Sequence, residues 1–75
     1  MSEDILRKFC SKYDVMLDDL LSHKRDIRLV RARVAISRYL RLDGYSFTYI
    51  AKLLNRHHSS IMYYVNEYKD VYDEE

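Results

Sequence analysis

The sequence predicts an all-α protein, a compact bundle of about five helices that contains a helix-turn-helix. Its 75 residues include no proline and a single glycine, Gly44, so the residues that usually delimit strands and hairpins are nearly missing. Apolar residues recur at spacings of three and four, the period of an amphipathic helix. With 48% hydrophobic and 33% charged residues, the composition is that of an ordinary globular protein. We therefore expect residues 1–75 to form one domain.

The first two helices are expected in the N-terminal third of the chain. Ser2 is suited to N-cap a first helix that ends near Lys12, with acidic residues in its first turn. The single cysteine, Cys10, falls on the apolar face of this helix and is interpreted as a small core residue. After a break at Tyr13, a second and short helix is expected from a group of apolar residues: Met16, Leu17, Leu20 and Leu21.

Basic residues gather in the middle of the chain, although the net charge is only +1. A long amphipathic helix is expected from about Arg28 to Leu42, with an arginine-rich outer face and a C-cap at Gly44. Residues 22–41 carry seven lysines and arginines against one acid, Asp26, whereas residues 67–75 carry five acids against one lysine. A basic face of this kind attracts phosphate. The acidic tail, from about residue 69, is expected to fray.

The last third of the chain follows the plan of a helix-turn-helix. Ser46 is suited to cap a fourth helix, Phe47 to Leu54, which a tight turn at residues 55–57 joins to a fifth helix from about His58 to Tyr72. The small Ala51 allows the two helices to approach closely, and short polar side chains open the second helix, where they can reach bases and phosphates. The residues expected to read bases are Arg56, His57, His58, Ser59 and Ser60.

Three blocks of the sequence are similar to one known family. They are Asp18-Asp19-Leu20-Leu21-Ser22 followed by Lys24-Arg25, Arg31-Ala32-Arg33-Val34-Ala35-Ile36, and Ser46-Phe47-Thr48-Tyr49-Ile50-Ala51 followed by Arg56-His57-His58-Ser59-Ser60-Ile61. From about Ile5 to Tyr68 the chain resembles the C-terminal DNA-binding domain of the bacterial replication initiator DnaA, in the Trp-repressor-like helix-turn-helix superfamily. The initiator's ATPase portion has no counterpart here, so no nucleotide is expected as a ligand.

The resemblance implies a protein that binds double-stranded DNA sequence-specifically in the regulation of transcription or replication, with the recognition helix in the major groove. Arg56, His58, Ser59 and Ser60 match the family signature Arg-Asp-His-Ser/Thr-Thr-Val, whereas His57 stands where the family has aspartate. A family glycine before Arg56 is missing, and the basic region is about one residue shorter. The residues expected on the DNA backbone or in the minor groove are Lys24, Arg25, Arg28, Arg31, Arg33, Tyr63 and Tyr64.

The main alternative is a protein-interaction module that kept the fold but binds a replication or transcription protein through its tyrosines. Tyr63 and Tyr64 are consecutive on the fifth helix, so we expect at least one of them to be exposed, where a hydroxyl reaches phosphate or a ring meets a partner. A single domain of this size makes few DNA contacts. Dimerisation or a partner protein would therefore raise its affinity for DNA.

Other functional classes find little support in the sequence. No paired carboxylates, nucleophile with a base, or glycine-rich loop indicates catalysis, so no enzyme is expected. The adjacent His57 and His58 point about 100° apart on a helix, and neither Cys10 nor His23 stands at ligand spacing from them, so neither a metal nor another cofactor is expected. No apolar run approaches the roughly 20 residues of a membrane span, and the start is acidic, so a cytoplasmic protein is expected.

Overall fold

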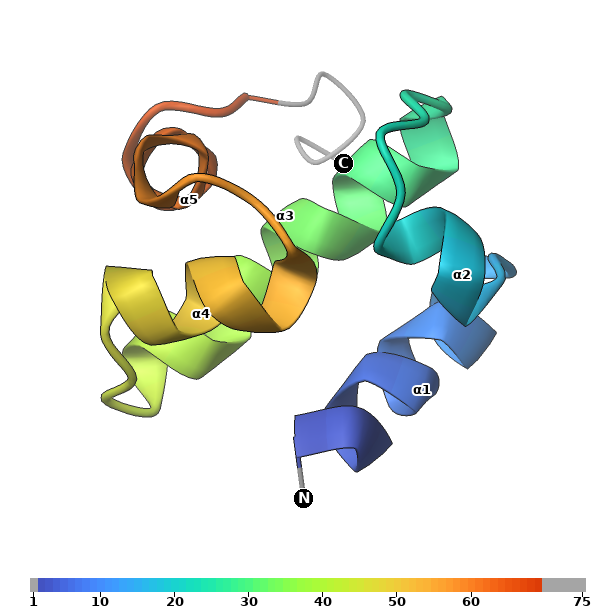
Figure 1. Ribbon diagram of the computed structural model, residues 1–75, viewed down its shortest axis with the longest axis horizontal. Helices are drawn as coiled ribbons and strands as arrows, with labels where there is room; N and C mark the ends of the chain where they lie inside the picture. The colour runs from blue at the N-terminus through green and yellow to red at the C-terminus, as the bar shows by residue number, and fades with distance from the viewer. Residues whose placement is uncertain (1, 70–75) are drawn as a thin grey trace.

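Five helices follow one another in residues 2–69, the part of the chain that the computed structural model describes, and this part contains no strand (Figure 1). They are α1 (Ser2–Tyr13), α2 (Leu17–Leu20), α3 (Ile27–Leu42), α4 (Phe47–Leu54) and α5 (His58–Asn66). The predicted all-α class is confirmed. The acidic tail, from residue 70 onward, lies outside the described residues. Within residues 2–69 no helix is long and apolar enough to cross a membrane.

Helix α3 is the centre of the molecule. The other four helices all pack against it, and α4 also packs on α5 and α1 on α2. In Figure 1, α1 and α2 lie to one side of α3, and α4 and α5 lie to the other. The core between them is built from Leu6, Cys10, Leu20, Ala32, Ile36, Leu40, Ile50, Ala51, Leu54 and Ile61. Cys10 is thus a core residue, as expected, and its burial raises the pKa of the thiol.

Side chains cap the starts of α3 and α4. Ser46 Oγ accepts the N–H of Tyr49 at 3.0 Å at the start of α4, which confirms the expected cap. At the start of α3 the Asp26 carboxylate accepts the N–H of Arg28 at 2.8 Å, and this bond lowers the pKa of Asp26. Helix α1 begins at Ser2, so Ser2 is its first helical residue rather than the cap before it.

Three helices end in the same way, with one residue in the left-handed conformation: Asp14 at φ 59°, Gly44 at φ 98° and Asn55 at φ 58°. In each case the N–H of the next residue donates to the carbonyl five positions earlier, at 2.8 to 3.1 Å. This is the Schellman arrangement, which satisfies carbonyls at the end of a helix. Gly44 ends α3 one position after the C-cap Asp43, close to its expected place.

Asn55 is the residue whose replacement tests the turn between α4 and α5. Its left-handed backbone disfavours a residue with a plain β-carbon, and its Nδ2 also donates to the carbonyl of Leu21 at 3.3 Å. We expect Asn55→Ala to lower the free energy of unfolding by about 1–2 kcal/mol. Asn55→Gly, which keeps the backbone conformation at no steric cost, should lose less. Urea unfolding followed by far-UV circular dichroism measures both, and equal losses would show that the side-chain bond, and not the backbone, stabilises the turn.

Candidate nucleic-acid interface

A groove of about 700 Å³ lies between α5, the turn before it, α3 and the loop that joins α2 to α3. We call this loop, residues 21–26, the basic loop. Of the residues predicted to bind DNA, the groove brings together Arg25, Arg33, Arg56, His57, Ser59, Ser60, Tyr63 and Tyr64. Those outside its lining are Lys24, Arg28, Arg31 and His58. The groove thus joins two segments that are about thirty positions apart in the sequence.

The side chain of Arg33 in α3 holds the basic loop in place through hydrogen bonds to its backbone. The side chain is only 1% exposed, and its guanidinium donates to four backbone carbonyls. Nε donates to Leu20 at 2.8 Å and Nη1 to Lys24 at 2.8 Å. Nη2 donates to both Asp19 and Ser22 at 3.0 Å. Because these carbonyls span the end of α2 and most of the basic loop, one buried arginine fixes the path of the chain between α2 and α3.

The predicted role of Arg33 at the DNA backbone is therefore wrong. A helix turns about 100° per residue, so Arg31 and Arg33 point roughly 200° apart and only one of them can lie on the outer face. The structure places Arg33 on the inner face, where burial, and then the charge of Arg56, lower its pKa. Arg33 shapes the interface without being available to a phosphate.

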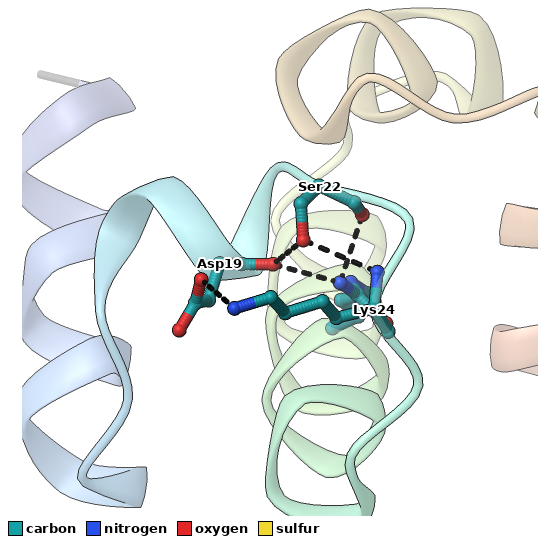
Figure 2. Close-up of polar contacts among 4 residues, drawn as sticks. Asp19, Ser22 and Lys24 are labelled. Atoms are coloured by element: carbon teal, nitrogen blue, oxygen red, sulfur yellow. Dashed lines mark hydrogen bonds and ion pairs between the residues drawn. The ribbon is translucent and has the colours of Figure 1, made fainter.

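The basic loop also carries polar contacts of its own, which Figure 2 shows. Ser22 Oγ donates to the carbonyl of Asp19 at 2.6 Å and accepts the N–H of Lys24 at 3.2 Å. The Lys24 ammonium pairs with the Asp19 carboxylate at 3.0 Å, so this side chain lies back toward α2 rather than in the groove. Exposed ion pairs of this kind are worth at most about 1 kcal/mol, so Lys24 can exchange its partner for a phosphate.

Arg28 stands at the start of α3, outside the groove. Its guanidinium lies 3.4 Å from the carboxylate of Asp26 and 3.5 Å from that of Asp14, and the side chain is exposed. Two acidic neighbours reduce the positive potential at this point. Arg31 is half-buried one turn further along α3 and also stays outside the groove lining.

The arginines in the second half of α3 stabilise the fold. Arg38 donates to the carbonyl of Tyr64 at 3.0 Å and to that of Tyr68 at 2.7 Å, and so closes the C-terminal end of α5. The Arg41 guanidinium lies 4.4 Å from the ring centre of Phe47, a cation–π contact. The arginines of the helix expected from the sequence are thus divided: Arg33, Arg38 and Arg41 make contacts within the protein, whereas Arg28 is exposed.

Arg56 links the turn before α5 to the basic loop. Its Nη2 donates to the carbonyl of Ser22, the same oxygen that accepts from Arg33. Next to it, Asn55 Nδ2 reaches the carbonyl of Leu21. The basic loop and the start of α5 are consequently held together by direct hydrogen bonds, and they present their side chains as one surface.

His57 caps α5. Its Nδ1 accepts the N–H of Ser59 at 3.2 Å and lies 2.8 Å from Ser59 Oγ. The His57 and His58 rings lie 4.4 Å apart, and both side chains are exposed. Further along the helix, Tyr63 is 51% exposed whereas Tyr64 is half-buried against the core. This confirms that at least one of the two consecutive tyrosines is exposed.

Four lining residues were not predicted: His23, Val30, Asn55 and Tyr68. His23 precedes Lys24 and Asn55 precedes Arg56, so their position beside predicted residues was the signal that could have found them. Tyr68 reaches the groove because the chain turns after α5. The sequence pattern does not indicate this turn.

Comparison with known proteins identifies one family. The family model described as "Bacterial dnaA protein helix-turn-helix" matches residues 2–67, a span that includes all five helices. No curated protein and no solved structure shows significant similarity to the chain.

Proposed function

Because the chain belongs to the family of bacterial DnaA helix-turn-helix domains, we propose that it binds double-stranded DNA sequence-specifically and acts in the regulation of replication or transcription. Helix α5 enters the major groove by its N-terminal end, and the basic loop lies on the flanking phosphates or in the minor groove. The groove carries this proposal, because Arg25 lines it together with residues at the start of α5. The helix dipole also favours phosphate at the N-terminal end of α5.

We assign base contacts to the start of α5 and its cap: Arg56, His57, His58, Ser59 and Ser60. Phosphate or minor-groove contacts are assigned to Lys24, Arg25, Arg28, Arg31, Tyr63 and Tyr64. In the free protein Arg56 bonds the Ser22 carbonyl, and in the complex it turns to a base. The Ser22 carbonyl is not left without a donor by this change, because it keeps its bond from Arg33. Arg33 takes part only by holding the basic loop.

The experiment is a fluorescence-anisotropy titration of a randomised duplex pool at two salt concentrations. The wild type is expected to bind with an affinity that falls steeply with salt, since lysines and arginines displace counterions from phosphate. Sequencing the bound fraction then gives the site. Absence of binding even at low salt would contradict the proposal.

Arg25→Ala is the single variant that tests the contribution of the basic loop. One lost phosphate contact should weaken binding to all sequences alike and reduce the slope of log affinity against log salt by about 0.9. Arg7→Ala is the matched control, because it removes the same charge from α1, where Arg7 pairs with Glu3 at 3.0 Å. If the two variants have the same slope, the basic loop does not lie on the DNA backbone.

Exposed apolar side chains favour a second candidate, a module that binds a replication or transcription protein. Met62 and Tyr63 are 40% and 51% exposed on the outer side of α5. Under this alternative the wild type fails to bind the duplex pool, and binding to a protein partner is lost in Tyr63→Ala but kept in Arg25→Ala.

A further inference from the structure

The cap of α5 fixes which hydrogen-bonding group His57 turns outward. Its Nδ1 accepts the backbone N–H of Ser59 at 3.2 Å. A ring nitrogen that accepts a hydrogen bond carries no proton, so in the neutral ring the proton is on Nε2. The outer edge of His57 therefore presents an N–H donor.

Two neighbours hold the ring in this orientation. The Ser59 hydroxyl lies 2.8 Å from the same Nδ1, and it donates to that nitrogen because Nδ1 is already an acceptor. The His58 ring packs beside that of His57, with the centres 4.4 Å apart and the planes 32° apart. Nδ1 is thus engaged within the protein, and only Nε2 is left for a ligand.

The position of His57 places this donor at the reading end of the helix. His57 immediately precedes α5 and lines the groove together with Ser59 and Tyr63. In a helix-turn-helix the N-terminal residues of the second helix contact base edges. A donor at that point distinguishes the bases, because guanine offers two major-groove acceptors, N7 and O6, whereas the major-groove edge of cytosine offers only its amino donor.

We propose that His57 makes the protein prefer guanine over cytosine at one position of its DNA site. The inference rests on the proposed DNA-binding function and adds the chemistry of one contact to it. A donor that faces the cytosine amino group leaves both groups unpaired, so we expect guanine to be preferred over cytosine by on the order of tenfold or more.

The test is selection from a randomised duplex pool with the wild type, His57→Asp and His57→Ser. Aspartate and serine both cap helices well, so α5 should keep its start in both variants, which far-UV circular dichroism checks. Aspartate presents only acceptors and should prefer cytosine where the wild type prefers guanine. Serine is too short to reach the base and should lose the preference at that position while the rest of the site stays the same.

A change from guanine to cytosine at a single position in His57→Asp supports the inference. If all three proteins bind DNA with the same preference at every position, the inference is overturned and the DNA-binding function stands. If the wild type binds no DNA at low salt, the proposed function fails and the inference fails with it.

Discussion

Replacing Arg33 by alanine is expected to destabilise the protein more than any other single change to a charged residue. The guanidinium is buried and bonds the carbonyls of four residues. Its loss takes the donor from the Leu20 and Lys24 carbonyls, whereas the Asp19 and Ser22 carbonyls keep the bonds from Ser22 Oγ and Arg56. Each such group costs about 1–3 kcal/mol, and we expect a total loss of about 3–5 kcal/mol in the free energy of unfolding. Native domains have only about 5–15 kcal/mol in all. Urea unfolding followed by far-UV circular dichroism measures the effect.

Two further variants show whether the shape of the Arg33 guanidinium or only its charge stabilises the protein. Arg33→Lys keeps the charge but lacks the planar fork that reaches four carbonyls, so its stability should lie between those of the wild type and Arg33→Ala. Arg7→Ala removes an exposed arginine and should change stability by less than about 0.5 kcal/mol. Wild-type stability in Arg33→Ala together with weakened DNA binding would mean that Arg33 is a surface contact after all.

Ile61→Ala is the second change for which we expect a large loss. Ile61 is fully buried and is the residue of α5 that belongs to the core. Shortening it removes buried methyl groups and leaves a cavity, which typically costs about 2–5 kcal/mol. Because we propose that α5 is the recognition helix, we also expect DNA affinity to fall along with stability.

The adjacent residue provides the matched control. Met62 is 40% exposed, so Met62→Ala should change the free energy of unfolding by no more than about 0.5 kcal/mol. Thermal unfolding of the two variants under identical conditions compares them directly. If they are equally destabilised, α5 does not pack on α3 and α4 with the face described here.

The helices could be predicted from the sequence because their signals are local. Apolar spacing gave the inner faces, and Ser46 and Gly44 marked helix boundaries through the conformations that they favour. The largest differences lie in short or irregular segments. Helix α2 covers only Leu17–Leu20. Helix α5 ends at Asn66 rather than near Tyr72, and Arg38 bonds the carbonyls of Tyr64 in its last turn and of Tyr68 just after it.

The part of the candidate site that is easiest to predict from the sequence is the part whose residues are contiguous. Residues 56–60 follow one another, so a single turn and helix start brings them to one surface. The basic residues of α3 come from different faces of a helix, and sequence spacing alone does not say which of them meets a carbonyl and which meets solvent. Arg33 illustrates this. It is buried because the end of α2 and the basic loop fold over it, and only that fold brings four carbonyls within reach of its guanidinium.

Bonds from the buried Arg33 shape the basic loop, and bonds from Arg56 and Asn55 attach the start of α5 to it. A surface organised in this way is formed before DNA arrives, so little conformational entropy should be lost on binding.

The most direct test of the central claim is a titration of the ¹⁵N-labelled protein with its selected duplex, followed by backbone amide chemical shifts. If the basic loop and the start of α5 form one DNA-binding surface, the largest shifts should appear at Arg25, Ser59 and Ser60, and the amides around Arg7 in α1 should stay nearly unchanged. Shifts confined to α1, or no shifts at low salt, would contradict the account.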